Sequence, residues 1–328
     1  MRYRSFGRTG LEVSELVFGG GAVGGILIDA DDDTRRAAIR QALDAGINWI
    51  DTAALYGNGR SEQALGWLLA EIDATPYVST KVMLDLAAGD IAGQIEASLV
   101  RSLTRLRRDS VTLFQLHNPI AAASTAKMVS PREITRSGGV LDTLERLRSQ
   151  GLFDHLGITA LGEAPAIIEV LDTGRVASAQ VYYNLLNPSA GRALPTAYEH
   201  ASFAGVLAAC ERNGAAAMCV RVLSAGVLAT DARHGREGPL TAGDTVESET
   251  AKAKAMQAAL GDAHGTRAQA AIRFALGEPR LSCVIVGLAE LAHLHEALDA
   301  QAMGSLPADA LERIEAVYAM GATRAPAP

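Results

Sequence analysis

Residues 33–50, DTRRAAIRQALDAGINWI, combine the pattern of one helix with that of one strand. Apolar residues recur at helical spacing over 33–45, and Gly46 supplies a helix stop. The run 47–50 that follows has the length and composition of a buried strand. This stretch therefore predicts an amphipathic helix that leads directly into a strand of a parallel sheet.

Similar short apolar runs occur eight times along the chain, with amphipathic stretches such as 91–106 and 141–150 between them. The runs lie at 16–18, 47–50, 77–80, 111–116, 155–158, 179–182, 217–222 and 283–286. Eight such units without a compositional break favour one parallel (β/α)8 barrel, the TIM barrel of the α/β class, over two doubly wound domains. We expect a single barrel domain over 1–328.

The segment before the first run has the pattern of a β-hairpin. It spans 3–16, with its turn at 7–10, and we expect it to close the floor of the barrel. Two longer segments rich in polar or small residues, 118–137 and 229–248, follow predicted strands. Loops in such positions lie on the catalytic rim of a barrel, where they shape the substrate pocket or cover a cofactor.

Composition excludes several classes of function. The 328 residues are 48% hydrophobic and 20% charged, and the net charge of -7 is spread along the chain, with no basic cluster for nucleic acid. The start MRYRSFGRTG lacks an apolar signal core, and no apolar run approaches the roughly 18 residues of a membrane span, so we expect a cytoplasmic protein without a membrane partner. Cys210, Cys219 and Cys283 are odd in number and widely spaced, which favours core residues over disulfides or a zinc site. We expect no metal.

The glycines of 19–24 satisfy the pattern G-x-G-x-x-G directly after an apolar run, which on its own would indicate a Rossmann dinucleotide fold. A Rossmann helix begins inside that motif, whereas here GILI at 25–28 intervenes and the helix start signal comes only at 31–34. We therefore expect these glycines, Gly20 among them, to let a backbone loop approach a ligand at the barrel mouth.

Four polar residues lie at or just past the ends of successive predicted strands: Asp51, Tyr56, Lys81 and His117. Each alone fits an ordinary structural role, as a cap, a packed ring, a rim charge or a strand-end histidine. Together they should converge on one rim, because the carboxyl ends of barrel strands meet there. Their convergence favours catalysis.

The chemistry that these four groups suit is carbonyl reduction. Hydride addition leaves negative charge on oxygen, so the site needs a proton donor and a positive neighbourhood. A tyrosine is a weak acid near neutrality, but an adjacent ammonium favours the phenolate. We expect Tyr56 to donate the proton, Lys81 to be that ammonium, Asp51 to hold Lys81, and His117 to place the substrate oxygen. In the oxidative direction Tyr56 becomes the base.

With these residues the sequence closely resembles the aldo-keto reductase family over essentially its whole length. The resemblance is carried by IDTA at 50–53 with YG at 56–57 and SE at 61–62, STK at 79–81, LFQLH at 113–117, GIT at 157–159 and QVYYN at 180–184. It implies the catalytic tetrad Asp51, Tyr56, Lys81 and His117, a nicotinamide cofactor across the barrel mouth, and carbonyl substrates such as aldehydes, ketones or aldoses.

The resemblance also implies contacts to the cofactor, Asp51 being one of the residues that make them. Thr159 and Gln180 match residues that hydrogen-bond the nicotinamide carboxamide, although Ala160 stands where the family often has Asn. The aromatic residue that usually stacks on the nicotinamide is replaced near Val220 and Arg221. The match to the loop under the pyrophosphate comprises Leu223, Ser224 and Gly226.

The segment 286–296 corresponds to the family's adenosine site and contains the implied contacts Gly287, Glu290 and Glu296. The family usually grips a 2′-phosphate there with Lys or Arg, and this segment has neither. Glu290 would repel a phosphate and accept from a ribose hydroxyl, which favours NAD(H), or else it caps a helix start. His293 and His295 would compensate weakly when protonated, and the family as a whole favours NADP(H). The cofactor preference stays open at this point.

The leading hypothesis is a catalytic oxidoreductase acting on small molecules as a monomer or small homo-oligomer. The long loop after His117, the stretch 221–226 and the weak phosphate site resemble bacterial sugar 1-dehydrogenases, so aldose oxidation is one version of it. The alternative is a cofactor-binding regulatory subunit with slow turnover, such as a channel subunit. A noncatalytic barrel would place no demand on the four polar residues together.

Overall fold

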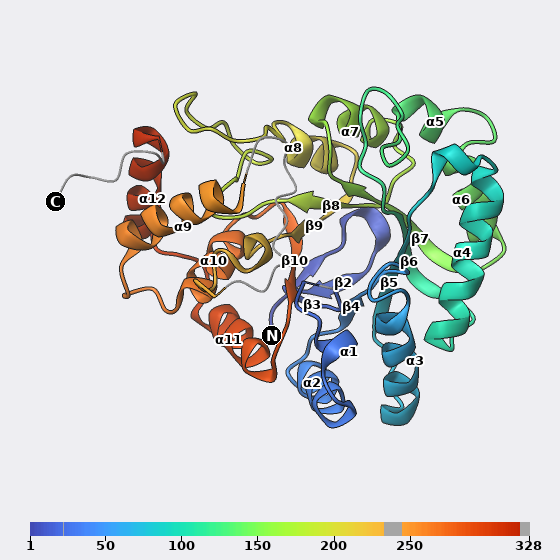
Figure 1. Ribbon diagram of the computed structural model, residues 1–328, viewed down its shortest axis with the longest axis horizontal. Coiled ribbons are helices and arrows are strands. Elements are labelled where there is room, and N and C mark those ends of the chain that lie inside the picture. The colour runs from blue at the N-terminus through green and yellow to red at the C-terminus, as the bar shows by residue number, and fades with distance from the viewer. Residues whose placement is uncertain (22, 233–244, 322–328) are drawn as a thin grey trace.

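The computed structural model describes residues 1–21, 23–232 and 245–321, and within them eight parallel strands close into a barrel (Figure 1). Neighbouring strands follow the order β10-β3-β4-β5-β6-β7-β8-β9. Their bounds are β3 Leu16–Gly19, β4 Trp49–Asp51, β5 Tyr77–Val82, β6 Val111–Leu116, β7 Phe153–Ala160, β8 Ser178–Tyr182, β9 Ala216–Val220 and β10 Leu281–Gly287. The predicted (β/α)8 barrel is confirmed, and the Rossmann alternative is excluded.

Helices surround the barrel in Figure 1 and cover the outer face of its strands. The predicted helices at 33–45, 91–106 and 141–150 are observed within one residue at each end, and a short helix at 26–29 was not predicted. The helices are α1 Ile26–Asp29, α2 Asp32–Asp44, α3 Arg60–Ile72, α4 Ile91–Leu106, α5 Pro131–Thr135, α6 Val140–Ser149, α7 Ala164–Leu171, α8 Val206–Arg212, α9 Val246–Leu260, α10 Arg267–Leu276, α11 Leu291–Met303 and α12 Ala308–Met320.

The predicted hairpin is present and packs into the lower end of the barrel. β1 (Tyr3–Ser5) and β2 (Glu12–Ser14) pair antiparallel, and the 3-10 turn η1 (Gly7–Thr9) lies between them. Phe6 contributes its ring to an apolar cluster inside the barrel, where it lies 4.5 Å from the ring of Trp49, centroid to centroid. Apolar side chains therefore fill the barrel interior at the hairpin end, and the polar side chains of the site lie toward the carboxyl ends of the strands.

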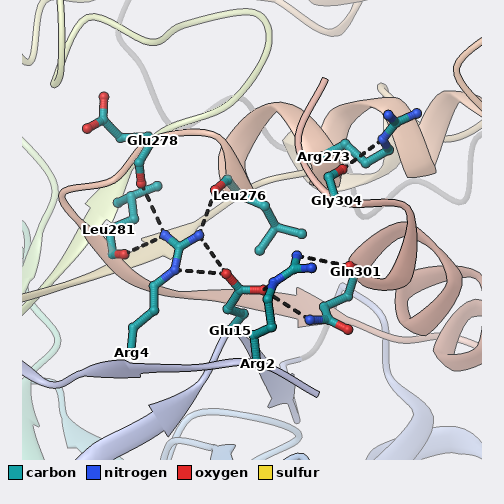
Figure 2. A network of polar contacts seen from close by, with 9 residues as sticks. All are labelled: Arg2, Arg4, Glu15, Arg273, Leu276, Glu278, Leu281, Gln301 and Gly304. Atoms are coloured by element: carbon teal, nitrogen blue, oxygen red, sulfur yellow. Dashed lines mark hydrogen bonds and ion pairs between the residues drawn. The ribbon is translucent and has the colours of Figure 1, made fainter. Parts of the chain in front are cut away.

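A polar network around the buried Glu15 ties this hairpin to helices from the other end of the chain (Figure 2). Glu15 accepts from Arg2 at 2.8 Å, from Arg4 at 2.8 Å and from Gln301 at 3.0 Å. Burial works to raise the pKa of Glu15, but the bonds from Gln301 and Arg4 outweigh it and hold the pKa below its usual value. The Arg4 guanidinium also donates to backbone carbonyls at and after the end of α10, those of Leu276, Glu278 and Leu281.

Cys210, Cys219 and Cys283 are buried free thiols, as their number and spacing predicted, and burial raises the pKa of each. No helix in the part of the chain that the structure describes has the length and apolar character needed to cross a membrane.

Candidate active site

Lys81 lies at the centre of the polar layer and brings three of the predicted residues together. Its Nζ lies 2.6 Å from Asp51 Oδ2, 2.8 Å from the carbonyl oxygen of Thr52 and 3.2 Å from Tyr56 Oη. An ammonium has three donors, so these contacts account for all of them. β4 ends at Asp51 and the adjacent β5 carries Lys81, which is why the two side chains meet inside the barrel.

The Lys81 side chain has no exposed surface, so its charge depends on its neighbours. Burial works to lower the pKa of Lys81, but the Asp51 carboxylate and then the Tyr56 hydroxyl outweigh it, and the net result is a raised pKa. Lys81 is therefore a buried ammonium at neutral pH, held against the phenol oxygen of Tyr56.

His117 follows β6 and packs against Tyr56. Its backbone N–H donates to the Val82 carbonyl at 2.8 Å, and its ring meets the Tyr56 ring edge-on, with centroids 5.8 Å apart and planes at 84°. Burial, and then the charge of Lys81, lower the pKa of His117 to about 3. The imidazole is neutral at pH 7, so one ring nitrogen carries a proton that it can donate to a substrate oxygen.

The second carboxylate oxygen of Asp51 has its own set of donors. Ser79 Oγ donates to Asp51 Oδ1 at 2.6 Å, and Gln180 Nε2 donates to the same oxygen at 2.8 Å. Behind Ser79, the indole Nε1 of Trp49 donates to Ser79 Oγ at 3.0 Å. Ser79 and Trp49 were not predicted as site residues. The available signal was the alternation along neighbouring strands, which puts Trp49 and Asp51, like Ser79 and Lys81, on the same inward face.

A cleft opens beside this group at the carboxyl ends of the strands. Asp51, Tyr56 and Gln180 line its inner end, and it continues past the residues that follow β9 to those that follow β10. Gly24 lies in its wall, where a Cβ would come within 2.5 Å of the Leu288 backbone, so the two backbones can approach this closely only because residue 24 is glycine.

The backbone after β9 is strained in the segment that runs beside the cleft. Three residues other than glycine have left-handed conformations, Arg221 at φ 60°, Ser224 at φ 44° and Ala225 at φ 55°. Each such residue costs on the order of 1–3 kcal/mol, and strain of this kind is common at ligand sites. The turn η3 (Ser224–Gly226) is part of this segment. Asn184 Nδ2 donates to the Arg221 carbonyl at 3.0 Å and fixes the strained backbone.

The model of the Aldo/keto reductase family matches residues 15–319. The chain belongs to this family. Its curated relatives include aldo-keto reductase YhdN of Bacillus subtilis (strain 168), 33% identical over 183 residues, 53% of this chain and 50% of the relative. L-galactose dehydrogenase of Arabidopsis thaliana is 31% identical over 162 residues, 48% of each. The chain thus spans about half the length of these relatives.

Two further similarities, one to a protein sequence and one to a solved structure, support less: the first covers a smaller part of the chain, and the second has low sequence identity. A probable voltage-gated potassium channel subunit beta of Oryza sativa subsp. japonica is 30% identical over 136 residues, 39% of this chain and 41% of the relative. The structure of an aldo-keto reductase from Bacillus halodurans, in its holo form, superposes with a TM-score of 0.74 at 21% identity and covers 97% of this chain and 96% of its own. At that identity the superposition shows a shared fold.

Within this aldo/keto reductase family member, the expected cofactor residues divide into two groups. Asp51, Gln180, Leu223, Gly226, Gly287 and Glu296 line the cleft. Thr159, Ser224, Gly20 and Glu290 are not among the described lining residues. Ser224 Oγ instead donates to Glu249 at 2.7 Å, and the Gly20 N–H donates to the Asp51 carbonyl at 2.8 Å.

Two of these residues bear directly on cofactor binding. Thr159 pairs with Gln180 in the β7–β8 register, and its Oγ1 is buried with no hydrogen-bond partner among the described residues. Glu290 is exposed at the N-cap position of α11, and its side chain makes no capping bond, so the helix-cap interpretation finds no support. Glu296, one turn into α11, is the acidic residue that faces the cleft there.

The two long rim segments differ in how far they can be placed. The segment 118–137 packs back on the barrel through bridges from Ile120 to Val129 and to Gly162. In the segment 229–248, Ala229, Thr230 and Ala232 line the cleft, while 233–244 lie outside the described residues.

Proposed function

We propose that the chain is a nicotinamide-dependent oxidoreductase that interconverts a carbonyl compound (an aldehyde, ketone or aldose) and the corresponding alcohol or lactone. The observation that carries this proposal is the continuous contact chain from Asp51 through the buried Lys81 ammonium to Tyr56 Oη, with neutral His117 against the Tyr56 ring. Membership of the family supports the same reaction class.

Each group has one task in the reductive direction. Tyr56 gives its phenolic proton to the carbonyl oxygen as negative charge develops there. Lys81, kept charged by Asp51, stabilises the phenolate that Tyr56 becomes. His117 donates a hydrogen bond to the same carbonyl oxygen and so holds it near Tyr56 Oη. In oxidation Tyr56 acts as the base and removes the proton of the alcohol.

The cleft residues fit a nicotinamide dinucleotide, which when bound would supply or accept the hydride. Thr159 Oγ1 is a buried hydroxyl without a described partner beside Gln180, and a carboxamide would satisfy it. Gln180 donates through Nε2 to Asp51, which leaves its carbonyl oxygen to accept from the carboxamide NH₂. Leu223 and Gly226 would lie under the diphosphate, and Gly287 under the adenosine end.

At the adenosine end we propose a preference for NAD(H). The lining residues around the start of α11 include Ala289, His293 and Glu296, and none of the described ones there is Lys or Arg. Glu296 accepts from the Thr266 hydroxyl, which orients its carboxylate beside the cleft. A carboxylate in that place suits a ribose hydroxyl and opposes a 2′-phosphate.

The test is a titration of tryptophan fluorescence with NADH and NADPH in parallel, followed by turnover assays with an aldehyde, ketone and aldose panel. We expect tighter binding of NADH and turnover of at least one carbonyl class. The panel includes aldoses because one of the relatives is an L-galactose dehydrogenase. Aldose oxidation is assayed as NADH production at mildly alkaline pH. Binding of a nicotinamide dinucleotide without turnover of any panel member would refute the enzymatic proposal.

A second candidate, a cofactor-binding regulatory subunit with slow turnover, is supported by the likeness to a potassium channel subunit beta. The rate of cofactor exchange separates the two. An enzyme exchanges and reacts bound NADH within seconds, whereas a sensor subunit keeps it for hours.

A further inference from the structure

Arg221 lines the cleft, but it is neither one of the four candidate catalytic residues nor one of the implied cofactor contacts. It follows directly after β9 and lines the same cleft as Tyr56 and Gln180. Among the described residues that line the cleft, Arg221 is the sole Lys or Arg, while Asp51 and Glu296 contribute carboxylates. Among the described lining residues, Arg221 is therefore the one guanidinium that an anionic ligand group in the cleft would meet.

The backbone of Arg221 has an unfavourable conformation that hydrogen bonds stabilise. Its φ of 60° is a conformation that an arginine adopts only at a cost. Its carbonyl accepts from Asn184 Nδ2 at 3.0 Å and from the Ser224 N–H at 2.8 Å, and these two bonds join the end of β9 to the neighbouring loop and to η3. The strained conformation is thus maintained by surrounding contacts, at a residue that lines the cleft.

The surroundings also make the charge effective. Burial lowers the pKa of Arg221, and the nearby acidic groups Tyr182, Glu249 and Tyr56 work against that effect. An arginine remains charged under these conditions. Because the site is partly shielded from water, its attraction for an anion is stronger than it would be on an open surface.

We propose that Arg221 is the anion-binding residue of the cleft, and that it takes a phosphate or carboxylate group of the bound ligand. Its planar fork of donors matches either group. Two sources offer this chemistry, the diphosphate of the dinucleotide and an acidic group on the carbonyl substrate. The assignment rests on the function proposed above, because it presumes that both ligands occupy this cleft.

The experiment compares Arg221→Gln with the wild type and with Arg132→Gln, a control that removes the same charge from an exposed residue outside the cleft. One arm measures calorimetric binding of ADP-ribose and of adenosine, and needs no turnover. The other measures kcat/KM for 4-carboxybenzaldehyde and benzaldehyde at saturating cofactor.

A loss of roughly tenfold or more in ADP-ribose binding, with adenosine unchanged, assigns the diphosphate. An equal loss in kcat/KM confined to the carboxylated aldehyde assigns the substrate. Unchanged values in both arms overturn the proposal, whereas absence of turnover with a clear ADP-ribose effect refutes only the proposed reaction. Should Arg221→Gln not fold, Arg221→Lys takes its place, with a several-fold loss expected from the missing fork and no loss counting against the role.

Discussion

Ser79 Oγ lies 2.6 Å from Asp51 Oδ1, on the carboxylate oxygen that Lys81 does not use. The direction of this hydrogen bond is fixed by its neighbours. The Trp49 indole can only donate, and it does so to Ser79 Oγ, while the Asp51 carboxylate can only accept. The Ser79 proton therefore points at Asp51. Hydrogen bonds that all run in one direction, from Trp49 to Ser79 and from Ser79 to Asp51, connect the apolar cluster inside the barrel to the polar site.

The first prediction concerns this bond. Ser79→Ala leaves Asp51 with fewer donors and freer to turn, so we expect kcat to fall about tenfold with cofactor affinity nearly unchanged. The basic limb of the pH–rate profile should shift as well, since Asp51 holds Lys81 charged.

Ser178→Ala is the matched control, because Ser178 is also buried in a barrel strand but its Oγ has no described hydrogen-bond partner. Equal effects of the two substitutions on kcat and on the pH profile would show that Ser79 matters for packing alone.

The second prediction concerns stability against pH. The folded-state pKa of His117 is about 3, below the ordinary value of 6.5, so the unfolded chain binds a proton between these values that the folded chain does not. The His117 contribution to stability is therefore full above pH 6.5 and falls as the pH drops toward 3, by about 2 kcal/mol at pH 5.

Urea unfolding of the wild type and of His117→Gln at pH 7.5, 6 and 5 measures this difference. The variant should lose less stability than the wild type on going from pH 7.5 to pH 5. Parallel pH dependences would mean that His117 is protonated in the folded protein as readily as in the unfolded one.

The third prediction concerns cofactor choice. Ala289 lines the cleft just before α11, so Ala289→Arg places a cation where a 2′-phosphate would lie. We expect NADPH affinity to rise about tenfold and NADH affinity to change little. Leu311→Arg, at an exposed position of α12, adds the same charge elsewhere as the control. A uniform rise for both cofactors, or none, would show that the adenosine end lies in another place.

The fourth prediction concerns the network around Glu15. Glu15→Gln removes the carboxylate that Arg2 and Arg4 share, and we expect the free energy of unfolding to drop by about 2 kcal/mol. The activity per folded molecule should remain, because the network is at the hairpin end of the barrel. Denaturant unfolding with a parallel activity assay checks both parts, and a loss of kcat in fully folded protein would contradict the purely structural role.

The elements of the fold could be predicted because each has a local signal. Apolar runs of strand length, helical periodicity and stops such as Gly46 predicted strands and helices close to their observed bounds. The short α1 escaped prediction, since four residues between Gly25 and Ala30 carry too little periodicity to separate a helical turn from a loop.

That Asp51, Tyr56, Lys81 and His117 would lie together could be predicted, because the carboxyl ends of barrel strands converge whatever the details of packing. The donors to Asp51 could not, since the contact between Ser79 and Asp51 depends on the strand register and the one with Gln180 reaches across the barrel. Helix phase likewise decides that Glu296 faces the cleft with His293, three residues earlier, whereas Glu290 precedes the helix.

We propose that Tyr56 transfers the proton while Lys81 and Asp51 hold it in place. The single-turnover rate of Tyr56→Phe at saturating cofactor and substrate, measured beside the equilibrium binding of the cofactor, tests this role. We expect a rate lower by about 10²–10⁴-fold, with cofactor affinity within a few-fold of the wild type. A rate equal to that of the wild type would contradict it.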